Sequence, residues 1–161
     1  MQPTIILKRR VPGLGRRELT AFVAAACRAA RLRGMVTLMV TDNRELRALN
    51  LRFKGADRAT DVLSFPAPVF VRGFAGDIAI SVEIASKNAQ LLRHSVSDEI
   101  RILVLHGVLH LAGYDHDSDS GEMAKRELLM RKRLSLPTGL IERNASGRKV
   151  KPTARPARVR T

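Results

Sequence analysis

The segment DEIRILVLHGVLHLAGYDH, residues 98–116, constrains the fold more than any other part of the chain. From Ile100 to Ala112 it is apolar almost all round, which predicts a helix buried in the centre of the protein. His106 and His110 are polar exceptions, and their i, i+4 spacing places both imidazoles on one helix face. Burying an imidazole without a partner costs about 1–3 kcal/mol. Two such histidines on one face therefore indicate a shared partner.

A third histidine follows directly after this helix. Gly113 can adopt a left-handed conformation that turns the chain back over the helix end, and His116 comes shortly after it. Three imidazoles that converge on one point supply the ligands of an open zinc site, in which water takes the fourth position. Nickel and copper accept the same ligands, but three imidazoles suit zinc best. We predict one Zn²⁺ per chain, bound by His106, His110 and His116.

The spacing H-x3-H-x2-G-x2-H also occurs in the metzincin metalloproteases. In those enzymes the residue after the first histidine is a glutamate, the general base of peptide hydrolysis, whereas this chain has Gly107 there. Glycine can neither take a proton from water nor orient it. The sequence thus predicts a metzincin-like metal site without the protease base, and a metalloprotease-like hydrolase is the less favoured alternative. The remaining histidine, His94, has no comparable partners, and we expect it at the surface or at a helix end.

The charge of the chain indicates a polyanionic partner. Lys and Arg number 29 against 15 for Asp and Glu, which gives a formal net charge of +14. A net charge this large on a small protein is typical of nucleic-acid binding. Residues 143–161 contain seven basic residues and no acidic one. Because residues 140–161 have too few apolar side chains to offset the entropy of folding, we predict a disordered basic tail that contacts a polyanion such as RNA.

Residues 1–139 are predicted to form a single α/β (α+β) domain, because apolar stretches of strand type alternate with segments of helical periodicity. The strands are expected at residues 4–9, 35–40, 62–66 and 76–81. The helices are expected at residues 16–33, 42–53, 81–93, 94–113 and 122–134. We expect Gly34 to end the first helix and Asp42 with Glu45 to form a capping box at the start of the second.

Membrane insertion and export are not expected. No stretch approaches the roughly 20 apolar residues of a membrane span, and the basic residues near the N-terminus follow its short apolar run instead of preceding it. The single cysteine, Cys27, allows no disulfide within the chain and fits a reducing compartment. We therefore expect a cytoplasmic protein that makes no membrane contact.

The histidine segment HGVLHLAGYDH, residues 106–116, resembles the signature of the YbeY family, the bacterial endoribonucleases of ribosomal RNA maturation. Three further blocks resemble family segments in the same order. They are Leu49–Asn50, TDVLSFP at residues 60–66 and GDIAIS at residues 76–81. The resemblance covers roughly residues 35–135.

This resemblance implies a mixed four-stranded sheet packed by about five helices, with zinc on the three histidines. It also implies a cytoplasmic, metal-dependent endoribonuclease that prefers single strands and acts in ribosomal RNA processing at the 3′ end of the small-subunit RNA. A role in ribosome quality control and contact with the small ribosomal subunit follow from the same resemblance. A non-catalytic, zinc-containing ribosome-assembly factor is a further alternative, against which three ligands instead of four argue.

The resemblance also suggests which residue contacts phosphate. The functional arginine of the family falls on Lys54, which keeps the positive charge but lacks the planar fork that binds a phosphate through two parallel hydrogen bonds. Arg52 and Arg58 are alternatives. We expect Lys54 to stabilise charge that develops on the phosphate. Asp115 is expected either to orient a ligand histidine or accept a proton, or to form a turn.

Overall fold

The computed structural model describes residues 2–138, in which four strands and five helices follow one another along the chain. The strands are β1 (Thr4–Leu7), β2 (Met35–Thr41), β3 (Val62–Pro66) and β4 (Phe74–Ser81). The helices are α1 (Arg16–Ala30), α2 (Asn43–Lys54), α3 (Val82–Leu92), α4 (Val96–Leu111) and α5 (Glu122–Arg133). The predicted tail at residues 140–161 lies outside the described residues. Within the described part, every helix is too short or too polar to span a membrane.

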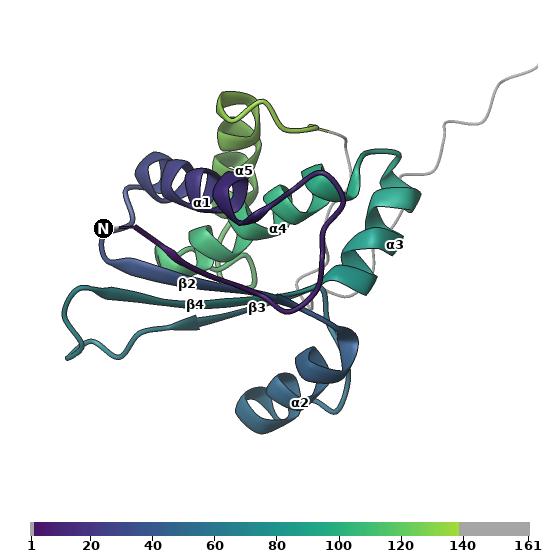
Figure 1. Ribbon diagram of the computed structural model, residues 1–161. Helices are drawn as coiled ribbons and strands as arrows, with labels where there is room; N and C mark the ends of the chain where they lie inside the picture. Colours follow the sequence, from purple (N-terminus) through teal and green to yellow (C-terminus); the bar gives the residue numbers. More distant parts are fainter. Residues whose placement is uncertain (1, 139–161) are drawn as a thin grey trace, which may run out of the picture.

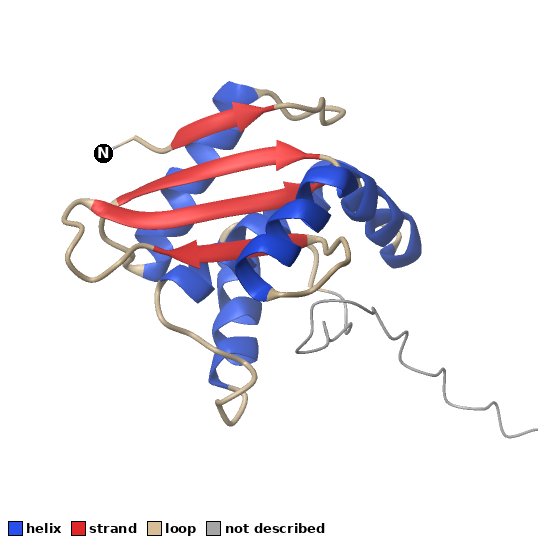
Figure 2. Cartoon of the chain, turned by 90° about the horizontal axis from the view of Figure 1, so that it is seen from below, coloured by secondary structure: helices blue, strands red, loops and turns tan. Residues whose placement is uncertain are grey.

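The strands form one mixed sheet in the order β1-β2-β4-β3. β1, β2 and β4 run parallel, and β3 pairs antiparallel with β4 as an edge strand. Helices α1, α4 and α5 lie on one face of this sheet and α2 on the other, while α3 packs beside α4 (Figure 1). Figure 2 shows the same sheet from the side that carries α2. The predicted four-stranded mixed sheet with five helices is confirmed.

Helix α4 lies in the centre of the core, as its apolar sequence predicts. Ile102, Leu103, Val104 and Leu105 are all fully buried, so the helix has no solvent-facing side over this turn. Its close approach to the sheet depends on Gly107, where a Cβ atom would lie 2.9 Å from Cγ2 of Ile78 in β4. The tight packing fixes α4, and every side chain it carries, relative to the sheet.

The expectation that Gly34 ends the first helix is wrong. α1 ends at Ala30, and Arg31 takes the left-handed conformation with φ of 55°. The backbone N–H of Leu32 then bonds to the carbonyl of Cys27 at 2.9 Å, and the Leu32 side chain packs on the core. Such an apolar contact just beyond the helix commonly accompanies a left-handed end. Gly34, with φ of 101°, instead leads into β2.

The predicted capping box at α2 is only half formed. The Asp42 side chain accepts a hydrogen bond from the Glu45 backbone at 3.0 Å, as expected. The Glu45 carboxylate, however, accepts from Thr41 Oγ1 at 2.6 Å and from Lys8 Nζ at 2.7 Å. Arg9 pairs with Asp42 in the same way, at 2.6 Å. Because Lys8 and Arg9 turn toward α2, β1 ends at Leu7 and not at the expected residue 9.

Candidate metal centre

Three histidines meet where α4 ends. His106 and His110 project from one face of the helix, and Gly113 takes a φ of 95°, the left-handed conformation that the sequence predicts. The turn returns the chain over the helix end and brings His116 to the other two. One ring nitrogen from each of the three residues lies within 4.8 Å of the others. The structure thus brings together all three histidines that the sequence predicts to converge.

The geometry and charge of this histidine cluster suit a cation. The Nε2 atoms of His106 and His110 are 3.1 Å apart, and the ring centres of the three residues are 4.7 to 5.4 Å apart. Burial, together with the nearby His106 and His116, lowers the pKa of His110 to about 4. At neutral pH this imidazole is therefore uncharged and keeps a lone pair for a metal. Three imidazole nitrogens that converge on one point are the donor set of an open zinc site.

A largely buried carboxylate, which the sequence did not lead us to expect, contacts this cluster from α5. Glu127 of α5 places Oε2 3.3 Å from Nδ1 of His106, and its Oε1 lies 2.9 Å from the guanidinium of Arg131. Burial opposes ionisation of Glu127, but the hydrogen bond and charge of His106, together with Arg131, lower its pKa to about 2. An ionised carboxylate can only accept, so His106 donates from Nδ1 and leaves Nε2 free to bind a metal.

The sequence held a signal for Glu127. Met123 and Met130 are fully buried on the inner face of α5, and Glu127 falls between them at helical spacing. A carboxylate on an apolar stripe needs a partner, and this requirement singles out Glu127 without identifying His106 as that partner.

Asp115 forms a turn. Its carboxylate accepts hydrogen bonds from the Asp117 backbone at 3.0 Å and from Ser118 Oγ at 3.1 Å, and these bonds lower the pKa of Asp115. Asp119 acts similarly at the start of α5, where it accepts from the backbone of Met123 at 2.9 Å. The acidic loop thus caps and orders the chain around His116. Among the described residues, the histidine cluster is the one group of three or more side chains arranged to hold a metal.

Lys54 lies on the other side of the sheet from α4. Its Nζ is 5.8 Å from the ring centre of Phe65 in β3, and Phe65 packs with the α2 side of the core. The preceding residue, Ser64, points to the opposite face and donates to the carbonyl of Gly107 at 3.4 Å. The edge strand β3 therefore lies between Lys54 and α4, and a ligand that reaches both must cross this edge. The loop after Lys54 is held by Asn50, whose side chain donates to the Arg58 carbonyl at 2.9 Å.

Of the two positions expected for His94, the helix end is confirmed, since this residue lies between the end of α3 and the start of α4, and the surface position is wrong. Its side chain is 10% exposed, and Nε2 lies 2.6 Å from Oε2 of the fully buried Glu99. Asn88 donates to Glu99 at 3.4 Å and to Asp61 at 3.3 Å, so the network joins α3, α4 and the start of β3. The left-handed conformation of Arg93, with φ of 56°, directs His94 back toward the first turn of α4.

The chain is similar to known proteins in sequence and in fold. A family model described as Endoribonuclease YbeY matches residues 15–135. The chain is 55% identical over 139 residues to the Endoribonuclease YbeY of Koribacter versatilis, a match that covers 86% of this chain and 90% of the relative. It is 50% identical over 109 residues to that of Nautilia profundicola, covering 68% and 78%. The solution structure of TM1509 from Thermotoga maritima matches with a TM-score of 0.53 and 30% identity, covering 78% of this chain and 83% of that one. The chain belongs to the YbeY family.

Proposed function

We propose that this protein is a metal-dependent endoribonuclease of ribosomal RNA processing and that its metal is zinc. The observation that carries the proposal is the convergence of His106, His110 and His116 in a member of a family whose relatives are named Endoribonuclease YbeY. A bound zinc ion supplies Lewis acidity at a phosphoryl oxygen and lowers the pKa of a water molecule. The neutral His110 and the Glu127-oriented His106 are the residues that prepare the site for it.

Lys54 is proposed as the residue that stabilises negative charge on the phosphate. Its ammonium group is exposed beside the edge strand β3, where a substrate bound at the histidine cluster would pass. A single RNA strand can bend across this edge, whereas a stiff duplex cannot follow it. This route supports a preference for single-stranded RNA.

Asp115 is proposed to position His116, because its carboxylate orders the turn that carries this histidine. The same hydrogen bonds lower its pKa, which makes Asp115 a weak acceptor for a proton from water. A positioning role is therefore favoured over that of a general base.

The finer assignments rest on the resemblance and on charge. We propose action at the 3′ end of the small-subunit RNA, a part in ribosome quality control, contact with the small ribosomal subunit and a cytoplasmic location. The net charge of +14 supports an RNA partner, and the seven basic residues of the tail would add phosphate contacts. The metalloprotease alternative lacks its base, since residue 107 is glycine. Three histidines instead of four ligands disfavour the alternative of a purely structural zinc in an assembly factor.

The test is cleavage of an RNA fragment that contains the 3′ end of the small-subunit RNA in single-stranded and duplex forms. Zinc-loaded protein should cut the single strand, and chelator-treated protein should not until zinc returns. His110→Ala, purified in parallel, should be inactive, which excludes a contaminating nuclease. Equal cleavage by wild type and His110→Ala would overturn the proposal, as would hydrolysis of a peptide but not of RNA.

Lys54 is tested separately with a matched control. Lys54→Ala should lower the cleavage rate while zinc content stays at wild-type level, and Lys54→Arg should keep or raise it because arginine retains the charge. Lys87 of α3 is also exposed, and Lys87→Ala should leave the rate unchanged. A fully active Lys54→Ala protein would shift the phosphate contact to Arg52 or Arg58.

A further inference from the structure

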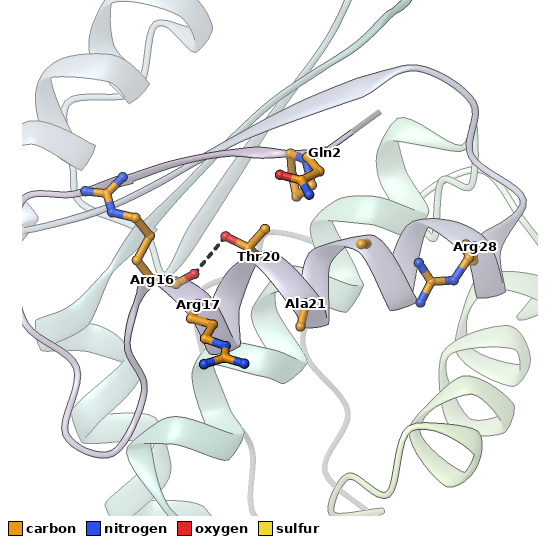
Figure 3. A pocket seen from close by; sticks show the side chains of 8 residues that line it. Gln2, Arg16, Arg17, Thr20, Ala21 and Arg28 are labelled. Carbon is orange, nitrogen blue, oxygen red and sulfur yellow. Dashed lines mark hydrogen bonds between the residues drawn. The ribbon is translucent and has the colours of Figure 1, made fainter.

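A basic groove runs between the start of the chain and helix α1, away from the histidine cluster. It has a volume of about 750 Å³ and is open to solvent. Figure 3 shows the side chains that line it. Arg16, Arg17 and Arg28 line it, and Thr20, Ala21 and Ala24 lie among them. Because the last three side chains are small, a ligand can approach the helix between the guanidinium groups.

All the charged side chains that line the groove are positive. Its lining residues include no carboxylate, and none of the ion pairs among the described residues involves Arg16, Arg17 or Arg28. The nearby Glu18 turns its carboxylate to the backbone N–H of Gly15, at 3.1 Å. Three guanidinium groups without a carboxylate partner favour an anionic ligand, and their planar forks match phosphate oxygens.

The groove does not favour binding of a peptide as an added β-strand. It borders β1, the edge strand of the sheet, whose outward backbone groups could otherwise pair with another chain. Arg16 donates to the carbonyl of Ile5 and so covers part of that edge. An extended peptide would have to displace this contact, whereas a phosphate chain can use the remaining guanidinium donors. The groove therefore fits a nucleic acid better than a protein segment.

The groove and the histidine cluster lie at opposite edges of the sheet. α4 packs on β3 and β4, while the groove borders β1 at the other end of the order β1-β2-β4-β3. Arg17 and Arg28 are separated by about 17 Å along the helix axis, at 1.5 Å per residue. We propose that this groove binds the sugar–phosphate backbone of a second segment of the RNA substrate, remote from the bond that is cut. The inference rests on the proposed endoribonuclease function.

The test uses zinc-loaded full-length protein and a double charge reversal, Arg17→Glu with Arg28→Glu. The control reverses Arg44 of α2 and Arg133 of α5 to glutamate. Both are exposed, and both double variants lower the net charge by the same amount. Affinity is measured for a long structured ribosomal RNA and for an oligonucleotide just long enough to reach the histidine cluster. A neutral pair, Arg17→Gln with Arg28→Gln, repeats the test if the charge reversal impairs folding.

The groove variant should bind the long RNA about 25–60-fold more weakly at 0.1 M salt, the effect of two lost phosphate contacts. Its slope of log affinity against log salt should become shallower by about 1.4–1.8. Cleavage of the short oligonucleotide and zinc content should match wild type, and the control variant should stay close to wild type in every measurement. This pattern of results supports binding of a second RNA segment in the groove.

Three results would overturn it. If the groove variant keeps its affinity for the long RNA while the wild type is active, RNA binding in the groove is refuted and the proposed endoribonuclease function is not. If the groove and control variants lose the same amount of RNA affinity, the effect comes from overall charge and not from the groove. A groove variant that keeps its RNA affinity but loses binding to a poly-glutamate peptide assigns the groove to an acidic protein instead. If the wild type neither binds nor cuts RNA, the proposed function fails together with the groove, and that outcome is distinguishable from the other three.

Discussion

Two histidines of this chain lie against carboxylates with little or no solvent exposure, and only one of them belongs to a cluster that can hold a metal. His106 faces Glu127 at 3.3 Å, and His94 faces Glu99 at 2.6 Å, each with a side chain that is 10% exposed. The two pairs are alike in chemistry, and their imidazoles are equally exposed. A histidine–carboxylate pair by itself therefore does not identify a metal ligand.

The difference lies in what surrounds each pair. Beyond Glu127, His106 meets two further imidazoles, and three nitrogen donors share one point. Around His94 the next groups are Asn88 and, through it, Asp61, which tie three elements of the fold together. The first pair orients a ring toward a shared centre, and the second links a turn to the core. This contrast predicts that the two pairs respond differently to substitution.

The largest effect is expected at the histidine cluster. His110→Ala should reduce zinc from one per chain to almost none, as measured by metal analysis of purified protein. The wild type should gain about 5.5 kcal/mol of stability at free zinc 10,000 times its Kd, and the variant should gain almost nothing. His94→Ala serves as the control and should keep its zinc. Zinc retained by His110→Ala would remove the distinction between the two histidine pairs.

The next effect concerns the network around His94. Glu99 is fully buried, so Glu99→Ala leaves His94 and Asn88 facing a void and should lower the free energy of unfolding by about 3–5 kcal/mol. Denaturant titration of the zinc-free protein measures this change, and the folded variant should still bind one zinc. Asp98→Ala, which removes a more exposed carboxylate from the same turn, should cost about 1 kcal/mol or less. A Glu99→Ala protein that folds normally but loses zinc would link the network to the metal centre.

A smaller effect is expected for Glu127, through the metal and not through the fold. Glu127→Gln keeps the shape but removes the charge that orients His106, and zinc affinity should fall about 10–100-fold, or roughly 1.4–2.7 kcal/mol. Competition with a zinc chelator gives this affinity. NMR of the His106 ring should show the proton no longer fixed on Nδ1. Unchanged affinity and an unchanged ring signal would place Glu127 among purely structural residues.

The smallest effect is expected for His94→Gln. The glutamine amide can still donate to Glu99, so the variant loses ring packing but no buried partner, and the unfolding free energy should fall by about 1 kcal/mol. Zinc content and affinity should not change. A loss as large as that of Glu99→Ala would mean that the imidazole, and not the carboxylate, holds the network together.

The sequence predicted the elements whose pattern is local. Strand β3 begins and ends at the expected residues, and α4 was evident from its apolar run and its two histidines. Gly113 signalled the turn that brings His116 back, because a left-handed conformation was needed there. These features depend on neighbours within a few residues, which periodicity and turn chemistry report directly.

The errors involve contacts that the chain makes elsewhere in the fold. Glu127 meets His106 from a different helix, and nothing in the local pattern of α5 names that partner. His94 is largely covered because Arg93 adopts a left-handed conformation that arginine rarely takes. For Lys54, which stays a predicted phosphate contact, the sequence could not indicate that β3 lies between it and α4.

The close packing of Gly107 bears on how a nuclease of this kind relates to peptidases with the same histidine spacing. A Cβ at residue 107 would point at Ile78, with three side-chain atoms of that isoleucine within 2.9 to 3.2 Å. A glutamate introduced by Gly107→Glu would therefore enter the interface between helix and sheet, and its carboxylate would face β4 instead of the metal ligands. Conversion to a peptidase would require the helix to move away from the sheet or to rotate. The close packing of α4 on the sheet separates the two activities, and a single substitution at residue 107 does not change that packing.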